Sequence, residues 1–283
     1  MSFGALHVLG GLAGGLLVGF LAAGLDRILT ARLQSRIGPP LLQPVYDVVK
    51  LLGKEALIVN AWQAFCACTT LLTAALAWLL FVLQSDLLLV FFVQAVGAVF
   101  LVVGALASGS PYSHIGAHRE LLQMLSYEPL LILVFIGMYL ETGSFRLEVL
   151  FAWPRPLLWR MPFLFLVLAF ALGIKMRKSP FDLSACHHAH QELVRGVLTD
   201  YSGPLLALTE IAHVFEVALM LGLFTLFWPG GGVGRFLLPV AVWALVIGVD
   251  NATSRSNWRW MLGTAWGLGL GLAIVNLVWI GQG

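Results

Sequence analysis

Three titratable side chains recur at a spacing of three within the apolar segment YSGPLLALTEIAHVFEVALMLGLF. These are Glu210, His213 and Glu216. A helix turns about 100° per residue, so the three side chains would share a sector of about 120°. Two carboxylates flanking an imidazole can hold and pass a proton, because burial and neighbouring charges shift such groups towards neutral pH. The alternative is a buried polar network that only ties helices together.

A further carboxylate, Glu128, lies in LLQMLSYEPLLILVF with apolar sequence on both sides. Pro129 follows it and has no backbone N–H, which frees a carbonyl one turn back. A locally weakened helix beside a carboxylate is common where a membrane span lines a hydrated cavity. Inside a membrane an ionisable side chain costs about 2.5–3.5 kcal/mol on insertion scales, so each such residue is a functional-site hypothesis.

The segment KMRKSPFDLSACHHAHQELVRGVLTDYSG carries a third group of polar side chains. If the chain is helical after Ser184, then His188, Glu192 and Arg195 share one face. A histidine-rich tract can bind metal, but a metal site requires a complete ligand set with suitable geometry, which the sequence does not show. We therefore expect no metal, and favour a proton relay or docking against a partner. The residues concerned are Asp182, His187, His188, His190, Glu192 and Asp200.

The composition indicates what kind of element positions these groups. The 283 residues are 60% hydrophobic and only 11% charged, whereas soluble domains carry about 25% charged residues. A protein core cannot absorb so much apolar surface, but lipid can, so the composition excludes a soluble enzyme. The net charge of +2 does not suggest nucleic acid. The three cysteines fit neither an iron–sulfur pattern nor a disulfide framework.

The chain predicts an all-α polytopic membrane protein with about eight transmembrane helices. A span needs about 20 mostly apolar residues, and the first apolar run lacks the features of a cleaved signal peptide, so we expect it to be retained as a helix. Without internal repeats or a domain boundary, residues 1–283 are expected to form a single transmembrane domain. The expected spans are Ala5–Leu29, Ala64–Leu83, Leu87–Leu106, Leu121–Leu140, Pro162–Ile174, Leu205–Phe227, Phe236–Val249 and Met261–Ile280.

The distribution of Lys and Arg predicts the orientation. Eight spans place both termini on one side of the membrane, and cytoplasmic loops carry an excess of Lys and Arg. Of the 16 such residues, only Arg146, Arg155, Arg160 and Arg235 fall in even-numbered loops. The remainder fall in or beside the odd-numbered loops, which are therefore predicted to be cytoplasmic, with both termini outside.

The first cytoplasmic loop contains IGPPLLQPVYDVVKLLGKE, in which Gly-Pro-Pro makes a rigid break. From Pro44 onwards, apolar residues recur at helical spacing through Leu52, while Asp47, Lys50 and Lys54 lie elsewhere. This pattern predicts a short amphipathic helix at the membrane surface or under a partner. An ordinary connecting helix is the alternative.

At these same segments the sequence resembles a known family. It is similar to the membrane subunit of respiratory complex I that forms the quinone chamber, and more similar to the homologous subunit of energy-converting membrane-bound [NiFe] hydrogenases of the ferredoxin-dependent and CO-induced kind. The residues that carry the resemblance are ARLQSRIGPPLLQPVYDVVKLLGKE, GSPYSHIGAHRE with LSYEP, KSPFDLSACHHAHQELVRG, TDYSG and DNATSR. They lie in order and span most of the chain. The SACHHAHQ stretch looks like the hydrogenase branch.

The resemblance implies a subunit without its own redox cofactor, whose chemistry takes place in partners, so whether the chain itself is an enzyme stays open. It would anchor a cytoplasmic module with a [NiFe] centre and iron–sulfur clusters, beside ferredoxin-like and antiporter-like subunits. It would couple ferredoxin-driven proton reduction to H⁺ or Na⁺ movement across the cytoplasmic membrane. The implied proton path is Glu128, Glu192, Asp200, Glu210, His213 and Glu216, and the implied docking residues are Arg32, Arg36, Arg119, Asp182, His187, His188 and His190.

The proton path departs from the family pattern at one point. The family's carboxylate in the sixth span, counted from YSG, falls at His213, with Glu210 and Glu216 one turn to either side. Glu128, Glu192 and Asp200 match acidic positions of the family. A residue-by-residue transfer of the path from the quinone branch therefore does not follow.

Three other functions stay open. The first is a quinone-binding membrane subunit of a complex I-like dehydrogenase. The second is the equivalent anchor of a sulfur-reducing or formate hydrogenlyase complex. The third is a stand-alone transporter, which inverted repeats would favour, and the sequence shows none.

Overall fold

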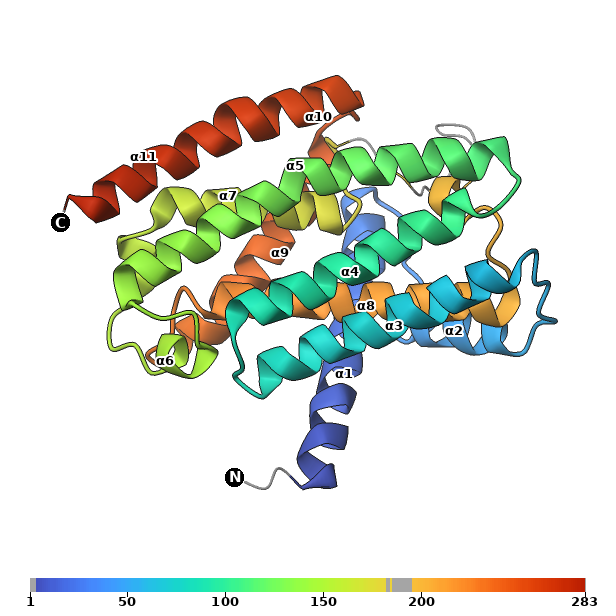
Figure 1. Ribbon diagram of the computed structural model, residues 1–283, viewed down its shortest axis with the longest axis horizontal. Helices are drawn as coiled ribbons and strands as arrows, with labels where there is room; N and C mark the ends of the chain where they lie inside the picture. The colour runs from blue at the N-terminus through green and yellow to red at the C-terminus, as the bar shows by residue number, and fades with distance from the viewer. Residues whose placement is uncertain (1–3, 182–183, 185–194, 283) are drawn as a thin grey trace. The chain divides into compact units, whose positions relative to one another are not determined.

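The computed structural model describes residues 4–181, 184 and 195–282, and these residues are almost entirely helical, with no β-strand among them (Figure 1). Short 3₁₀ turns at Leu157–Trp159 (η1) and Gly196–Leu198 (η2), and a π-helical turn at Ala265–Gly269 (η3), interrupt or join the α-helices. The α-helices are α1 (Ala5–Leu33), α2 (Gln43–Leu52), α3 (Ala61–Val82), α4 (Leu87–Leu106), α5 (Pro111–Thr142), α6 (Leu147–Phe151), α7 (Pro162–Lys175), α8 (Gly203–Thr225), α9 (Gly234–Ala252), α10 (Trp258–Thr264) and α11 (Leu270–Gly281).

The predicted class, an all-α polytopic membrane protein, is confirmed. Seven helices among the described residues are long and apolar enough to cross a membrane, the last being the continuous stretch Trp258–Gly281. The fifth expected span, Pro162–Ile174, corresponds to α7, which has 14 residues. At 1.5 Å per residue it is roughly 21 Å long, shorter than a hydrocarbon core of about 30 Å. Much of α7 is buried by other parts of the protein, where a short helix is tolerated.

The span boundaries differ from the expected ones mainly at α5. This helix begins at Pro111, ten residues before the expected start at Leu121. The additional residues, PYSHIGAHRE, are largely polar, so hydropathy alone could not include them. Pro at the first helical position suits a helix start, because its missing N–H would have no intrahelical partner there.

The predicted amphipathic helix after the first span is present as α2. It buries Pro44 and Val48, one turn apart, whereas Val49 and Leu52 of the expected apolar stripe are exposed. Arg27 of α1 donates a hydrogen bond of 2.6 Å to the Asp47 carboxylate of α2. Partial burial raises the pKa of Asp47, but hydrogen bonds and charge from Arg27 outweigh it, so the pKa lies below its ordinary value. The contact is therefore kept at neutral pH and lost only as the pH falls through that lowered value.

The described residues group into two compact units. The first unit takes in 4–83, 90–121, 184 and 195–219, and the second takes in 84–89, 122–181 and 220–282. Helices α5 and α8 each contribute residues to both units. The expectation of a single transmembrane domain remains a prediction.

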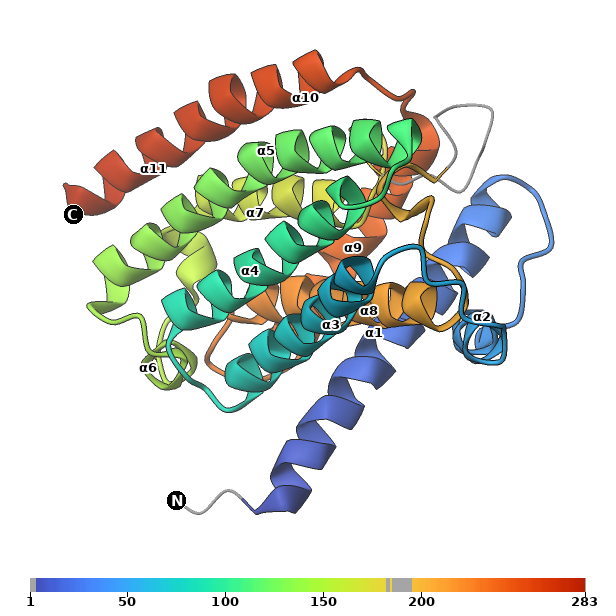
Figure 2. The same ribbon diagram turned by 45° about the vertical axis from the view of Figure 1, so that its right-hand side comes forward.

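Small residues set the packing of the first unit. The indole of Trp78 on α3 donates a hydrogen bond of 2.8 Å to the Gly11 carbonyl of α1, and a side chain at Gly15 would collide with that indole. Helices α3 and α4 run side by side (Figures 1 and 2), with Gly97 of α4 against Thr70 and Thr73 of α3. Close approach at small residues is the usual packing of membrane helices, because lipid supplies little hydrophobic drive between them.

In the second unit, α11 supplies the first turn of α7 with hydrogen-bond partners. The side-chain oxygen of Asn276, which is fully buried, accepts from the backbone N–H groups of Phe163 and Leu164 at 3.0 Å each. Its amide nitrogen donates to the Arg160 carbonyl at 2.9 Å. The N-terminal N–H groups of a helix have no intrahelical partners, so Asn276 acts as a cap supplied from another helix.

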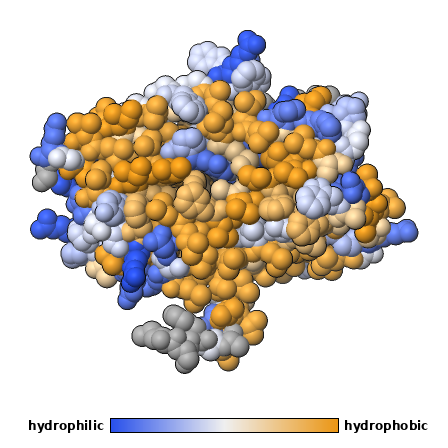
Figure 3. Space-filling view, viewed as in Figure 1, coloured by the Kyte–Doolittle hydropathy of each residue, from blue (hydrophilic) through white to orange (hydrophobic). Residues whose placement is uncertain are grey.

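The surface of the molecule is apolar over long stretches of helix. Side chains such as Leu6, Phe236 and Leu268 are largely exposed, and apolar side chains cover most of the face seen in Figure 3. Exposed apolar patches of this extent are not tolerated in water, whereas lipid accommodates them. The protein is thus a multi-pass membrane protein.

Candidate functional site

The middle of α8 carries the three titratable residues predicted to act together. The Nδ1 atom of His213 lies 3.7 Å from an Oε atom of Glu216. Glu210, one turn earlier, lies 3.9 Å from a guanidinium nitrogen of Arg195. The imidazole of His213 thus lies beside one carboxylate of α8, and the guanidinium of Arg195, from the turn before α8, lies beside the other.

These three residues occupy the less covered face of an otherwise buried helix. From Leu205 to Phe224 every residue is buried except Leu208, Ile211 and the three titratable ones, which are half-buried. A half-buried carboxylate keeps access to water or to a partner, and a wholly buried one does not. All three titratable side chains are therefore accessible from the less covered side of α8.

The position of Arg195 depends on an unusual turn. Arg195 and Gly196 both have positive φ values, of 47° and 48°, a region that favours glycine. The η2 turn that follows packs its backbone against Gly116 of α5, where a Cβ atom would collide with the Gly196 and Val197 backbone. Gly116 thus permits a backbone-to-backbone approach that no larger residue allows.

One face of α5 holds the chain on both sides of residues 185–194. The hydroxyl of Ser184 donates to the Glu120 carboxylate, and the hydroxyl of Ser113 donates to Asp200 at 2.7 Å. Ser113, Gly116 and Glu120 recur at helical spacing, so they lie on one side of α5. The backbone N–H of Val197 also donates to the Ser184 carbonyl at 3.0 Å. Ser184 and the 195–200 segment are therefore fixed against the same helix.

Glu128 lies in the second unit, half-buried on α5 beside Pro129. The carbonyl that Pro129 leaves without its helical partner is that of Leu125, and the indole of Trp266 donates to it at 3.2 Å. Trp266 belongs to the π-helical turn η3. The expected weak point of the helix is thus present, and a side chain from another helix satisfies it.

Lys175 is a second charged group in this region. The sequence places it in a loop, but the structure buries it in the last turn of α7, with its ammonium 5.0 Å from the ring centroid of Tyr127. Tyr127 directly precedes Glu128. A buried cation over an aromatic face gains cation–π attraction where water is excluded.

Three buried polar side chains of the first unit have polar atoms with no hydrogen-bond partner among the described residues. These atoms are both polar atoms of the Gln63 amide, the amide nitrogen of Gln94 and the Tyr201 hydroxyl. The Tyr201 hydroxyl lies against Gly104 and Cys66, and burial raises its pKa well above the ordinary value. Buried polar groups of this kind are usually satisfied by ordered water.

The predicted docking residues are placed as follows. Arg32 and Arg36 are exposed, at the end of α1 and just after it, and Arg36 contacts Gln34. Arg119 is half-buried in the polar extension of α5. Asp182, His187, His188, His190 and Glu192 lie outside the described residues. Within the described part of the chain no group of three or more His, Cys, Asp or Glu side chains has the arrangement of a metal site.

Sequence reasoning missed Ser113, Glu120 and Ser184, which hold the chain around residues 185–194. The helical spacing of Ser113, Gly116 and Glu120 was a readable signal in PYSHIGAHRE. Their partners were not readable, because Asp200 is 87 residues from Ser113 and Ser184 is 64 residues from Glu120.

Comparison with known proteins gives a family match over nearly the whole chain. The family model described as NADH dehydrogenase matches residues 6–281. Hydrogenase-4 component C of Escherichia coli (strain K12) is 28% identical, over 92% of this chain and 90% of its own. Formate hydrogenlyase subunit 4 of the same strain is 30% identical, over 81% of this chain and 79% of its own. An NADH-quinone oxidoreductase subunit of Cereibacter sphaeroides (strain ATCC 17029 / ATH 2.4.9) is 32% identical, over 91% of each chain.

A solved structure shares the fold. A chain of the membrane-bound sulfane sulfur reductase, described as an archaeal respiratory membrane complex, superposes with a TM-score of 0.87. The match covers 97% of this chain and 98% of that one, at 24% sequence identity. At that identity the likeness establishes the fold and leaves the partner chemistry open.

Proposed function

The chain belongs to the family that the NADH dehydrogenase model describes, and on that premise we propose that it is the membrane anchor of a multisubunit energy-converting oxidoreductase complex. Its relatives are membrane subunits of hydrogenase, formate hydrogenlyase and complex I assemblies. Of these branches we propose the hydrogenase one, because of the SACHHAHQ stretch and the hydrogenase-4 relative. The complex would couple ferredoxin-driven proton reduction to H⁺ or Na⁺ translocation.

The observation that carries the coupling role is the half-buried face of α8. Glu210, His213 and Glu216 are ionisable groups within a helix that is otherwise packed. Placing ionisable groups in a membrane span is costly, so their retention without a function is unfavourable. Because Nδ1 of His213 is within 3.7 Å of Glu216, the imidazole is placed to pass a proton to or from that carboxylate.

Arg195 supplies a link between this face and the cytoplasmic loop. Its guanidinium lies 3.9 Å from Glu210 and attracts the ionised carboxylate. A partner that displaces Arg195 would remove that attraction. Coupling of this kind requires two states that bind protons differently. Asp200 and Glu128 are proposed members of the same path, as is Glu192, which lies outside the described residues.

Docking of the hydrophilic module is proposed on the exposed end of α1 and the loops that follow it. Arg32 and Arg36 are exposed there, together with Ile37, which is 96% exposed, and Tyr46 of α2. Cations beside exposed apolar and aromatic side chains are typical of interaction surfaces. Arg119 and the loop residues Asp182, His187, His188 and His190 complete the proposed docking set.

We propose that the redox cofactors belong to partner subunits. A [NiFe] centre and iron–sulfur clusters would carry out electron transfer and proton reduction there. This chain would hold those subunits on the membrane and handle protons through its own carboxylates. The proposed partners are the hydrogenase large and small subunits, ferredoxin-like subunits and antiporter-like membrane subunits.

A second candidate is the quinone-binding membrane subunit of a complex I-like dehydrogenase. The relative with 32% identity over 91% of both chains is an NADH-quinone oxidoreductase subunit. The two candidates differ in their partners and in the electron acceptor. Purifying the complex through a tag on this chain separates them, because a large [NiFe] subunit with hydrogen production supports the first, and quinone reduction supports the second.

The proton-handling role is tested by changing Glu210 and Glu216 singly to Gln, which keeps the size and removes the charge. The complex should assemble in normal amounts, because Gln retains hydrogen bonding. Ion pumping by membrane vesicles should fall at least tenfold if the carboxylate is obligatory, and redox turnover should fall with it or become uncoupled. Pumping is measured as a pH or sodium gradient during turnover.

Glu148→Gln is the matched control, since it makes the same change at an exposed position. It should pump as the unaltered complex does. Scarce or dissociated complex in the α8 variants would instead assign these residues a structural role. Normal assembly with normal pumping in both variants would refute the proposal.

A further inference from the structure

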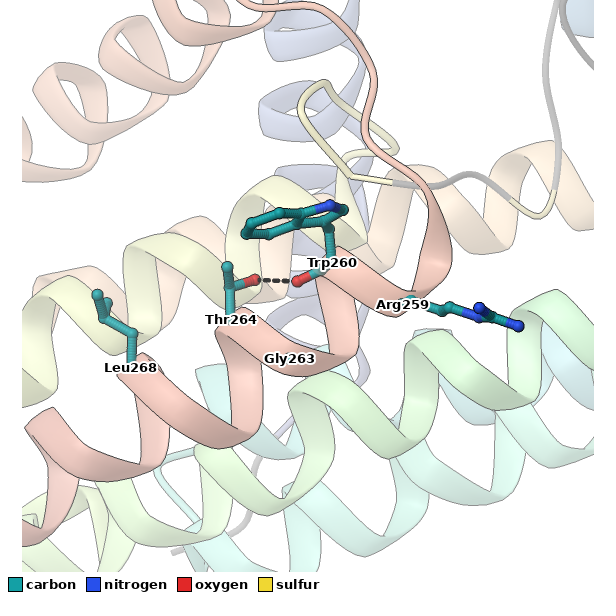
Figure 4. A pocket seen from close by; sticks show the side chains of 5 residues that line it. All are labelled: Arg259, Trp260, Gly263, Thr264 and Leu268. Carbon is teal, nitrogen blue, oxygen red and sulfur yellow. Dashed lines mark hydrogen bonds between the residues drawn. The ribbon is translucent and has the colours of Figure 1, made fainter.

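Two adjoining pockets open in the second unit at the start of its last long helix. One, of about 420 Å³, is lined by Arg259, Trp260, Gly263, Thr264 and Leu268 (Figure 4). The other, of about 470 Å³, lies beside α7 and α9 and has Trp260 and Thr264 in its wall as well. Both volumes fall in the range of small-molecule sites. The shared wall makes them neighbours.

The lining is apolar along its length and cationic at one end. In Figure 4, Arg259 and Leu268 mark opposite ends of the first pocket, with Trp260 and Thr264 between them. The Thr264 hydroxyl donates to the Trp260 carbonyl at 2.8 Å, so its methyl group is the part left to contact a ligand. Gly263 has open space where a side chain would lie. The pocket floor is thus backbone and methyl groups.

The length of the first pocket matches one leaflet of a bilayer. Arg259 and Leu268 are nine residues apart, which is roughly 14 Å along a helix. Half of a hydrocarbon core of about 30 Å is a similar distance. Trp258 and Trp260 stand at the polar end and are exposed, as tryptophan commonly is at the membrane–water boundary.

The charge at that end is not neutralised by the described part of the chain. Arg27, Arg160, Lys178 and Arg195 each lie beside a carboxylate. Arg259 takes part in none of the ion pairs between described residues; its guanidinium lies 5.4 Å from the Trp258 ring centroid. A cation with no counter-charge among the described residues, at the headgroup level of an apolar groove, is complementary to a phosphate.

We infer that this groove binds an anionic phospholipid, with its phosphate on Arg259 and its two acyl chains in the two adjoining pockets. Two chains need two apolar channels that meet below one headgroup, and Trp260 with Thr264 form the wall between such channels. The bound lipid would belong to the leaflet on the side of Arg259. It would fill a surface of the last helix that this chain leaves open.

The test uses the intact complex in vesicles that contain equal amounts of phosphatidylglycerol and phosphatidylcholine. In separate experiments, first one lipid and then the other carries a photoreactive acyl chain. Cross-links should map to residues 258–268. Phosphatidylglycerol should be labelled about fivefold more than phosphatidylcholine, which is the preference that one cation at the membrane surface gives for an anionic lipid. Arg259→Gln should reduce that preference to about one. Arg235→Gln is the control, since its guanidinium is stacked on Phe151 at the other end of α9, and it should keep the preference.

A second pair of variants tests the acyl channel. Gly263→Leu fills the pocket and should abolish labelling by both lipids. Gly271→Leu makes the same change at another open position of the helix and should not. Equal labelling by the two lipids, or a preference that survives Arg259→Gln, would overturn the inference, as would cross-linking of another subunit to residues 258–268. Loss of labelling in excess inorganic phosphate would identify a site for a free anion instead.

Discussion

Gly116 determines how closely two stretches of backbone approach in the first unit. A Cβ atom there would collide with the backbone of Gly196 and Val197, which cannot move aside as a flexible side chain can. The turn that follows Arg195 therefore requires glycine at position 116. Since Arg195 lies beside Glu210, Gly116 also affects the proposed proton path.

We expect Gly116→Ala to destabilise the protein by about 1–3 kcal/mol, the usual cost of overpacking. The purified protein in detergent should unfold several degrees lower, measured by its thermal unfolding midpoint. Gly14→Ala is the control, because it is also helical but has open space around it, and Ala favours a helix over Gly. Equal midpoints for the two variants would show that η2 can shift away from α5 without cost.

At the residue scale, the sequence predicted only those parts of the site whose residues lie close together in one segment. The spacing of Glu210, His213 and Glu216 is a helical periodicity within one segment, so their common face on α8 followed from the sequence. The pairing of Ser113 with Asp200 and of Glu120 with Ser184 joins distant parts of the chain, and no periodicity encodes it. Trp266 as the partner of the carbonyl freed by Pro129 could not be predicted for the same reason.

At the scale of elements, α7 is the helix that depends most on a neighbour. It begins without a side-chain cap of its own, since the side chain of Met161 at its N-cap makes no hydrogen bond to the first turn. Asn276 of α11 accepts from two of the N–H groups instead. In an apolar setting such groups cost several kcal/mol when left unsatisfied. A short buried helix is thus stabilised from outside its own sequence.

Asn276→Leu, which keeps the size, should destabilise the protein by at least about 1–3 kcal/mol, because it leaves buried N–H groups without an acceptor. Amide hydrogen exchange at Phe163 and Leu164 should become faster, and the thermal unfolding midpoint should fall. Asn276→Asp retains an acceptor for the two N–H groups but loses the donor to the Arg160 carbonyl and adds an acidic group to a buried site. Exchange at the two amides should then lie between that of the unaltered protein and that of the Leu variant. Unchanged exchange at both amides in the Leu variant would contradict the capping role.

The elements themselves were largely predictable, because long apolar runs have few alternatives to a membrane helix. The run Leu87–Leu106 coincides with α4, and the amphipathic stretch after Pro44 coincides with α2. The polar first third of α5 was missed, because hydropathy indicates contact with lipid and these ten residues are largely polar. Helix α7 begins at the expected Pro162 and ends one residue after the expected Ile174, but its 14 residues are fewer than a membrane span needs.

For the whole molecule, the topology depends on whether α7 crosses the membrane. Eight crossings place both termini outside and all odd-numbered loops in the cytoplasm, in agreement with the distribution of Lys and Arg. Seven crossings would reverse the side of every segment after α7. The short length of α7 and the buried Lys175 at its end are the features that favour seven crossings. The single-domain prediction rests on the same continuity of spans through the chain.

Three cysteine positions distinguish the two topologies in a background without the native cysteines. Ser35, Ser144 and Gly230 lie in the first, fourth and sixth loops, and a side chain at Gly230 meets nothing closer than 3.9 Å. A membrane-impermeant maleimide should label Ser35→Cys only from the cytoplasmic side, and Ser144→Cys and Gly230→Cys only from the opposite side. Labelling of Ser35→Cys and Ser144→Cys from the same side would refute the first four crossings. Labelling of Gly230→Cys from the side of Ser35→Cys, with Ser144→Cys on the other, would mean that α7 does not cross, and that Arg255 and Arg259 face outwards.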